Sequence, residues 1–462
     1  MVIKQALQNV KNYILDFIYT PTYIVMVALL VLFFYLVNLP LIMLGLMVLL
    51  ASFIFIESED LTPILPMLCM VLFIFNDLRI AATIEFYIVL LPAGVSLIYH
   101  FFKYKRKLVK GKLILPLIIY SIALALGGIF SPHISSYMTG LATVLALGPV
   151  ILIIYIVFSQ YVIPPKNFDI KKYFCILIIS IAFLVSLQLV TLMLEKLSVL
   201  FAQNKPYSFK KILVGELGWG NVNAVACLLL FSLPAGFYLL TTSKHFTVNV
   251  IIIFLTYVFI TLTHSQSVLG LSLAFLIPLI WASYNRMNKT NKKNLLVFCG
   301  LIIALLIICV IIFNQMIPKA IHYFKNEISN DSGRTKLYKN AFDFFCKYPI
   351  FGIGQGYNAL GIEQLFGRNG NFHSTLFHTL ATMGLFGFIA YVYYLVNRIR
   401  ILVANNSTFN FMMFIAFILF EIHAMVDACE FNAIPLMTIV TITLVVVERL
   451  NNVKEDKLPL SL

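Results

Sequence analysis

Long apolar segments recur along the whole chain, and many of them approach the length that a helix needs to cross a bilayer. A transmembrane helix takes about 20 residues to span roughly 30 Å of hydrocarbon. Of the 462 residues, 61% are hydrophobic and 11% are charged, whereas a soluble domain carries about 25% charged residues. Lipid offers no partners to free backbone groups, and the segments lack the alternation of barrel strands. The sequence therefore predicts an all-α fold, a polytopic transmembrane helical bundle.

The positions of these segments predict about fourteen spans. They cover residues 21–37, 40–56, 62–76, 80–102, 113–130, 138–158, 173–194, 222–242, 247–263, 268–283, 295–314, 372–396, 411–428 and 434–447. The segment at 62–76 is short enough to be re-entrant, and the first two segments could merge. A total of about twelve spans is therefore the alternative.

Short basic segments connect many of these spans. They include residues 103–112, residues 286–293, the pair Arg398 and Arg400, and residues 449–457. With about fourteen spans, all of them fall on the same side of the membrane as the N-terminus. Because cytoplasmic loops collect Lys and Arg, we predict that this side, with both termini, is cytoplasmic. Such loops also account for the net charge of +14, so nucleic acid is not expected as a partner.

Two long loops fall on the opposite, extracytoplasmic side. They run from about residue 195 to 221 and from about residue 315 to 371, and the second holds seven basic residues against four acidic ones. Basic residues on this side run against the charge bias of membrane proteins. Our hypothesis is that they bind an anion. The alternative is an ordinary solvated loop that is long enough to escape the bias.

The larger loop contains a predicted helix. Residues 330–332 can cap a helix N-terminus, and apolar side chains recur at three- and four-residue spacing over residues 333–345. Such an amphipathic helix could lie on the membrane with its apolar face down. Arg334 would stand at its start, where free N–H groups and a forked guanidinium together suit a phosphate or diphosphate. The glycine-rich stretch at 352–356 suits a tight turn or a close approach to a ligand.

His373 lies where the next span leaves the extracytoplasmic face. An imidazole takes or gives a proton near neutral pH, so His373 is a candidate general base. The alternative is an interfacial histidine that caps the start of the helix. His378 lies five residues further on, about 140° around a helix, and is not expected to pair with His373.

Four ionisable residues lie within or just after the penultimate span: Glu421, His423, Asp427 and Glu430. His423 and Asp427 are four residues apart and would share one face of a helix. Ionisable groups within a membrane are functional candidates. The alternative is that this polar pair pins the helix to its neighbours.

The seven cysteines show no paired spacing, and most of them lie in apolar segments. We interpret these cysteines as small core residues, with Cys346 alone in a polar segment. The sequence has no phosphate loop and no metal-ligand spacing, so neither a cofactor nor a metal ion is expected.

Several short motifs occur in an order that resembles one known family. They are Gly220-Asn-Val-Asn-Ala224, Thr263-His-Ser-Gln-Ser267, Ser332-Gly-Arg334, Tyr348-Pro-Ile-Phe-Gly-Ile-Gly-Gln-Gly-Tyr357, His373-Ser-Thr-Leu376 and Met383-Gly-Leu-Phe-Gly387. In their order, spacing and side of the membrane, they resemble the O-antigen ligase and polymerase family of bacterial membrane glycosyltransferases. The similarity covers residues 218–395.

The resemblance implies a GT-C-like fold in the bacterial cytoplasmic membrane. It implies a donor glycan linked to a polyprenyl diphosphate such as undecaprenyl diphosphate. A hydroxyl of a glycan or lipid acceptor would attack the anomeric carbon at the extracytoplasmic face and release lipid diphosphate. In this family the loop Arg and the loop-end His are regarded as essential, and they correspond here to Arg334 and His373.

The family usually has an Arg in the Thr/Ser-rich motif, where this chain has Gln266. A basic residue of one of the two outer loops, such as Lys205, could supply the missing charge. The residues that the resemblance and the loop charges together suggest for binding diphosphate or glycan are Arg368, Lys336, Lys339, Gln266, His264, Lys210, Lys211, Asn221 and Asn223.

We expect N-terminal transmembrane helices over residues 1–200, a ligase- or polymerase-like region over 201–450 that includes the loop 315–371, and a cytoplasmic tail over 451–462. The predicted activity is polymerisation of surface-polysaccharide repeat units, because Gln266 departs from the ligase pattern. A ligase that moves the glycan to a final lipid or wall acceptor is the alternative. A lipid-linked oligosaccharide flippase is an alternative of another class, and it should show an internal repeat. Membrane lipid and other polysaccharide-export proteins are the remaining expected partners.

Overall fold

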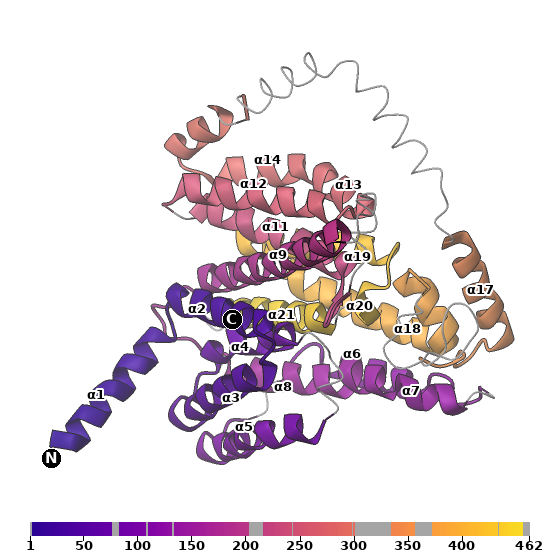
Figure 1. Ribbon diagram of the computed structural model, residues 1–462, viewed down its shortest axis with the longest axis horizontal. Coiled ribbons are helices and arrows are strands. Elements are labelled where there is room, and N and C mark those ends of the chain that lie inside the picture. Colours follow the sequence, from indigo (N-terminus) through magenta and orange to yellow (C-terminus); the bar gives the residue numbers. More distant parts are fainter. Residues whose placement is uncertain are drawn as a thin grey trace, which may run out of the picture.

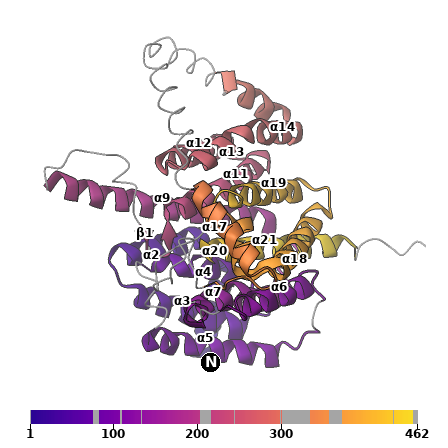
Figure 2. The same cartoon turned by 90° about the vertical axis from the view of Figure 1, so that its right-hand side faces the viewer.

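The computed structural model describes residues 2–75, 83–107, 110–131, 134–202, 216–242, 244–297, 299–300, 334–355, 372–432 and 434–455. Apart from one two-stranded hairpin, the described elements are helices (Figures 1 and 2). In the first half of the chain they are α1 (Val2–Phe17), α2 (Pro21–Leu36), α3 (Pro40–Glu57), η1 (Thr62–Ile64), α4 (Leu65–Met70), η2 (Val71–Ile74), α5 (Ile84–Lys103), α6 (Ile114–Leu126), α7 (Ile134–Leu145), η4 (Ala146–Val150), α8 (Ile151–Tyr161) and α9 (Ile170–Ala202). In the second half they are β1 (Glu216–Leu217), β2 (Gly220–Asn221), α11 (Val222–Thr242), α12 (Phe246–Leu262), α13 (Gln266–Ala274), α14 (Leu276–Arg286), α17 (Arg334–Lys347), α18 (Thr375–Val403), α19 (Thr408–Ala424), α20 (Cys429–Asn432) and α21 (Ile434–Glu455).

The protein is a helical, multi-pass membrane protein, as the sequence predicts. Within the described residues, eight helices are long and apolar enough to cross a membrane, and up to nine if a bent pair counts as one span. Four shorter apolar helices, among them α12 and α19, fall on other predicted spans. The predicted span at 295–314 lies mostly outside the described residues. The total of about fourteen spans therefore stays a prediction.

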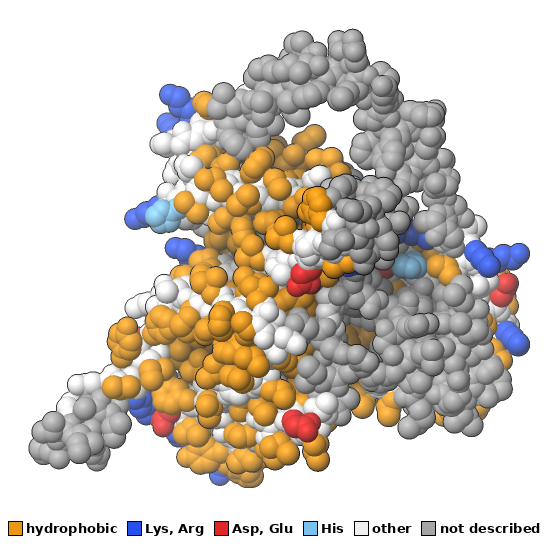
Figure 3. Space-filling view, viewed as in Figure 1, with side chains coloured by type: hydrophobic (Ala, Val, Ile, Leu, Met, Phe, Trp, Pro, Cys, Tyr) orange, Lys and Arg blue, Asp and Glu red, His pale blue; other side chains and the backbone are white. Residues whose placement is uncertain are grey.

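The centre of the bundle is α11. Its side chains are buried from Val222 to Leu240, apart from that of Asn223, and α9, α12 and α19 pack around it. At the periphery, α5 buries few side chains and exposes large apolar ones such as Leu91 and Val95. Hydrophobic side chains cover most of the described part of the face in Figure 3. Such a surface is suited to lipid rather than to water.

The first helix lies across the direction of the second. α1 and α2 meet at 84°, and Thr20 caps α2 by accepting a hydrogen bond from the Tyr23 N–H (3.3 Å). α1 projects away from the bundle (Figure 1). If α2 crosses the membrane, α1 lies roughly parallel to the membrane surface, which is the position that an amphipathic helix adopts.

α18 is interrupted at Gly384, whose backbone angles (φ 64°, ψ −160°) are not helical. An interrupted helix leaves backbone groups without their partners, and inside a membrane these must be satisfied by other protein groups. Here the segment 349–354, which we call the glycine turn, supplies them. The four bonds run from Leu385 N–H to Pro349 C=O, Phe386 N–H to Ile350 C=O, Ile353 N–H to Ala381 C=O and Gly354 N–H to Thr382 C=O, at 2.8–3.1 Å.

The close approach of the two backbones requires glycine on both sides. A Cβ on Gly352 would lie 2.4 Å from the carbonyl carbon of Thr382, and one on Gly384 would lie 2.5 Å from that of Ile350. Gly352 and Gly354 also have positive φ (65° and 101°), which glycine adopts without a steric cost. The predicted tight turn is therefore confirmed, and what it approaches is α18.

Arg398 does not belong to an exposed basic loop, as its place beside Arg400 suggests, but lies within α18. Arg398 is fully buried, and its Nη1 lies 2.7 Å from Glu430 Oε1 and 3.2 Å from Glu421 Oε1. The guanidinium also stacks over the Tyr394 ring, 4.2 Å from its centroid. A buried charge needs such partners, and this cluster joins α18 to α19 and α20.

Candidate functional site

His373 precedes α18 in a left-handed backbone conformation (φ 47°). Residues other than glycine rarely adopt this region, and such outliers gather at functional sites. The cap of α18 is the next residue, Ser374, whose hydroxyl accepts a hydrogen bond from the Phe377 N–H (3.5 Å). His373 is therefore not the cap of the helix. Its side chain is 38% exposed, which leaves the imidazole accessible to a substrate.

The carboxylate of Asp427 faces the His373 ring. Asp427 Oδ1 lies 3.4 Å from His373 Nδ1, and the Asp427 side chain is 4% exposed. This is within ion-pair distance, although longer than a strong hydrogen bond. The Ala428 N–H also donates to Asp427 Oδ1 (2.8 Å), which fixes the carboxylate. A carboxylate on Nδ1 orients an imidazole and leaves Nε2 for proton transfer.

The pairing of Asp427 with His373 was not predicted from the sequence, where Asp427 is grouped with His423. α19 ends at Ala424, but the Asp427 N–H still donates to the His423 carbonyl (3.0 Å). The two residues therefore stay neighbours, as expected, while Asp427 lies in the turn that follows the helix. The available signal was the intramembrane acidic residue itself. Its partner lies 54 positions away in the chain, so spacing gives no indication of it.

α17 brings the predicted outer-loop helix to His373. It spans Arg334–Lys347, close to the predicted 333–345, and it lies across the end of the bundle in Figure 2. The Tyr338 hydroxyl donates to the His373 backbone carbonyl (3.1 Å), and the Tyr338 ring stacks on Phe377 at 4.6 Å. The predicted capping residues 330–332 lie outside the described part of the chain.

The apolar face of α17 packs partly on protein rather than wholly on lipid. Ala341 is buried in a small cluster with Phe372 and Ala381, and Leu337 and Phe344 pack against it. Of the predicted apolar stripe, Phe342 is exposed. The helix is therefore fixed against the start of α18, and this fixes the position of its first residue relative to His373.

Arg334 is the first described residue of α17 and is half-buried. It lies near enough to His423 for an electrostatic interaction between the two side chains. The other predicted cations of this helix, Lys336 and Lys339, are exposed. Arg334, His373, His423 and Asp427 therefore belong to one neighbourhood at this end of the bundle.

The Thr/Ser-rich motif reaches the same neighbourhood through Ser267. The Ser267 hydroxyl lies 3.2 Å from His423 Nδ1. His264 and Gln266 are exposed, and His264 has a positive φ of 53°. Gln266 begins α13. The motif is thus a sharp turn between α12 and α13 that presents polar side chains beside α19.

Of the two predicted asparagines, Asn221 precedes α11 and has a clear structural role, whereas Asn223 lies in the first turn of that helix. Asn221 Oδ1 accepts a hydrogen bond from the Ala224 N–H (3.0 Å), so Asn221 caps the first turn of α11. Asn223 is half-buried. The predicted binding residues Lys210, Lys211 and Arg368, together with Lys205, lie outside the described residues.

His378 takes no part in the pair formed by His373 and Asp427. It is buried, and its Nε2 lies 3.0 Å from Gln355 Oε1. Gln355 in turn donates to the Thr382 hydroxyl (2.9 Å). This agrees with the expectation that the two histidines point to different sides of the helix, and it assigns His378 to the contact between α18 and Gln355, the residue that follows the glycine turn.

Comparison with known proteins points to the part of the chain that holds most of these site residues. Residues 250–392 match the family model of O-antigen ligase, a segment that includes the Thr/Ser-rich motif, α17, the glycine turn and His373 but not Asp427. No curated protein matches the chain. The chain therefore carries an O-antigen ligase family domain at residues 250–392 within a multi-pass membrane protein, and this domain identifies it as an enzyme that transfers lipid-linked glycans.

Proposed function

We propose that the protein polymerises the repeat units of a surface polysaccharide at the extracytoplasmic face of the bacterial cytoplasmic membrane. The donor is a glycan linked to a polyprenyl diphosphate, and the acceptor is a hydroxyl of another lipid-linked repeat unit. One observation carries the proposal: the Tyr338 hydrogen bond joins α17, which begins at Arg334, to His373 (3.1 Å). A cation for the diphosphate and a base for the hydroxyl are thereby held together within a family domain that acts on such donors.

His373 acts as the general base. With its Nδ1 held 3.4 Å from Asp427 Oδ1, Nε2 takes the proton of the acceptor hydroxyl. The hydroxyl oxygen forms a bond to the anomeric carbon while the bond from that carbon to the diphosphate oxygen breaks. The electron pair of the broken bond stays on the diphosphate. The Asp427 carboxylate stabilises the imidazolium that forms.

Arg334 stabilises the negative charge that develops on the leaving diphosphate. A guanidinium offers two parallel donors to phosphate oxygens, and the free N–H groups at a helix start add to it. Fixed donors of this kind are commonly the largest source of transition-state stabilisation. The exposed Lys336 and Lys339 on the same helix attract the anionic donor to the site.

The proposal includes an orientation. A total of about fourteen spans places both termini in the cytoplasm. It places α17 and His373 on the extracytoplasmic side. Residues 201–450 then form the catalytic region and residues 1–200 a block of supporting helices. A reporter fused near Asn340 should read as extracytoplasmic. A cytoplasmic signal from that fusion would overturn both the orientation and the proposed function.

Polymerase is preferred to ligase because of Gln266. This residue carries no charge where the ligase pattern has Arg, and it is exposed at the start of α13. Reconstitution of the purified protein in liposomes with purified lipid-linked repeat units tests the choice. Polymer that grows on the lipid carrier supports a polymerase, whereas transfer only to a separate lipid or wall acceptor indicates a ligase. Movement of the donor between leaflets without new glycosidic bonds indicates a flippase.

Two substitutions test the residues in the same assay. Arg334→Ala and His373→Ala should each abolish polymer formation at normal protein levels. The matched control is Lys347→Ala, which removes an exposed cation from the opposite end of the same helix and should leave polymer length and amount unchanged. Polymer of normal length and amount in both site variants would refute the proposed roles of Arg334 and His373.

A further inference from the structure

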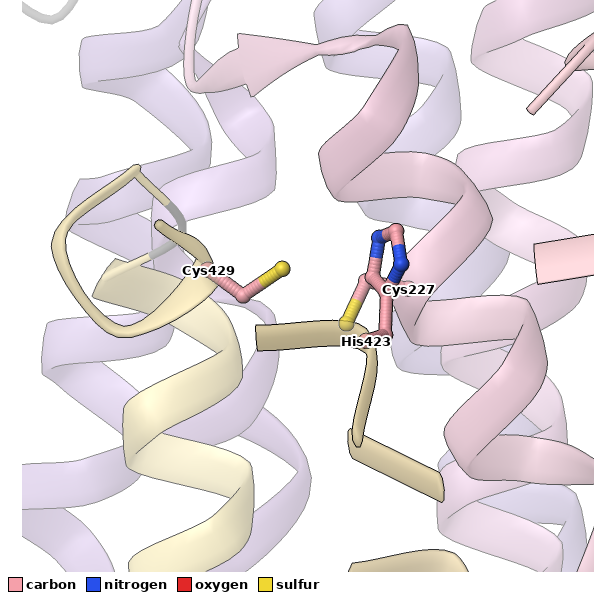
Figure 4. A group of neighbouring side chains, drawn as sticks. All are labelled: Cys227, His423 and Cys429. Atoms are coloured by element: carbon pink, nitrogen blue, oxygen red, sulfur yellow. The ribbon is translucent and has the colours of Figure 1, made fainter. Parts of the chain in front are cut away.

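Two cysteines and a histidine from three different helices meet inside the bundle. Cys227 lies on α11, His423 near the end of α19 and Cys429 at the start of α20. One ring nitrogen of His423 and the two sulfur atoms all lie within 4.8 Å of one another. Figure 4 shows the sulfur atoms directed toward each other, with the imidazole beside Cys227. All three side chains are buried, with at most 2% exposed.

The His423 ring is prepared for a further ligand. Its Nδ1 lies 3.2 Å from the Ser267 hydroxyl oxygen, while its buried Nε2 has no hydrogen-bond partner among the described residues. When Nδ1–H donates to Ser267, Nε2 carries a lone pair. Metal-binding histidines show this arrangement: one nitrogen binds the ion, and the other is held by a hydrogen bond that fixes the tautomer and the ring.

We infer that Cys227, His423 and Cys429 form a site for a thiophilic metal cation, with Zn²⁺ as the ion to test. Zinc binds cysteine sulfur at about 2.3 Å and histidine nitrogen at about 2.0–2.1 Å. Around a tetrahedral ion such ligand atoms lie roughly 3.5–3.8 Å apart. Atoms that already lie within 4.8 Å of one another need to move by only about 1 Å to reach that geometry.

The charges also fit a buried site. Binding displaces the protons of the two thiols, so two thiolates and a divalent cation leave no net charge. A neutral group of this kind avoids the large cost of an unpaired ion in the interior. Soft sulfur ligands favour zinc over the hard cations Mg²⁺ and Ca²⁺, which prefer oxygen.

The position of the site gives the ion a structural role. His423 lies four residues before Asp427, and Cys429 lies two residues after it. An ion bound to both, and to Cys227 on α11, would hold the turn that carries Asp427 against the central helix. The inference does not depend on the proposed function, because metal binding is measured without turnover.

The experiment measures metal content of the full-length protein, purified in detergent without chelators. We expect about one zinc per chain by mass spectrometry of the metals. Cys227→Ala and Cys429→Ala should each lower this content at least about tenfold. The matched control is Cys69→Ala, since Cys69 is equally buried, at 2%, but lies on α4; this variant should keep its zinc. Replacement by Co²⁺ should give thiolate-to-cobalt charge-transfer absorption in the wild type and the control.

Ser267→Ala separates the site from a general loss of structure. It removes no ligand, and it should weaken zinc affinity about tenfold in a chelator competition while the elution profile of the protein stays unchanged. Two results would overturn the inference. One is wild-type protein that contains no metal and takes up none when reduced and incubated with Zn²⁺. The other is a disulfide between Cys227 and Cys429 found in alkylated peptides of the native protein.

Discussion

The hydroxyl of Tyr338 on α17 donates a hydrogen bond to the backbone carbonyl of His373, 3.1 Å away. His373 has a left-handed backbone there, so its carbonyl has no place in the regular helix that follows. The bond therefore stabilises an unusual conformation and at the same time fixes α17 against the start of α18. One side chain thus determines how the predicted cation of one helix lies relative to the predicted base of another.

Tyr338→Phe should reduce turnover about 2- to 10-fold with little change in protein level, because one hydrogen bond is lost while the aromatic stacking on Phe377 remains. The measurement is the rate of glycosidic bond formation in liposomes. Tyr393→Phe, on an exposed face of α18, is the matched control and should match the wild type. If the two variants behave alike, the bond does not position His373.

Asp427→Asn should lower turnover about 100-fold, because the amide cannot stabilise an imidazolium. The loss should be smaller than that of His373→Ala, because Asp427 acts on the acceptor hydroxyl only through the imidazole of His373. The measurement is the rate of glycosidic bond formation in liposomes. A rate of Asp427→Asn equal to that of the wild type would show that the carboxylate does not assist His373.

Gly384→Ala should destabilise the protein by roughly 1–3 kcal/mol or more, because the new Cβ would lie 2.5 Å from the Ile350 carbonyl group at a φ of 64°. Thermal unfolding in detergent measures the change. Gly270→Ala is the control: a Cβ there meets nothing within 4 Å, and alanine favours a helix over glycine. Its midpoint should stay equal or rise.

Arg398→Met should destabilise the protein by about 3–5 kcal/mol, because Glu421 and Glu430 would be left as unpaired buried acids. Adding Glu421→Gln and Glu430→Gln to that variant should recover much of the loss, since no unpaired charge then remains. Unfolding midpoints of the single and the triple variant provide the test. Equal destabilisation of both would mean that packing, not charge, determines the cost.

The bundle and most of its helices follow from the sequence because membrane insertion depends on local properties. Apolar length and basic loops identify spans such as α11 and the segment formed by α13 and α14 without any knowledge of their partners. The amphipathic period likewise predicts α17 to within two residues at its end. Arg398 shows where local reasoning fails, because two acidic residues on later helices compensate it inside the bundle.

The candidate site could be predicted only in pieces. Arg334 and His373 stand in recognisable local patterns, whereas the pairing of His373 with Asp427 and the meeting of Cys227 with Cys429 depend on how α11, α18, α19 and α20 pack. Such contacts join positions far apart in the chain, and no spacing encodes them. The glycine motif predicts a tight turn or a close approach to a ligand. The structure has the turn, and its partner, the break in α18, is visible only in three dimensions.

The break at Gly384 and the glycine turn also have an evolutionary consequence. The turn supplies the hydrogen bonds that the interrupted helix lacks, on both sides of the interruption. The break in α18 is therefore braced by the turn and is not a hinge. A homologue with a regular helix at α18 would leave the backbone groups of the glycine turn without their partners. A homologue without Gly352 would likewise leave the groups of the interrupted helix without theirs. Gly352 and Gly384, which lie 32 positions apart in the chain, should therefore be inherited or lost together.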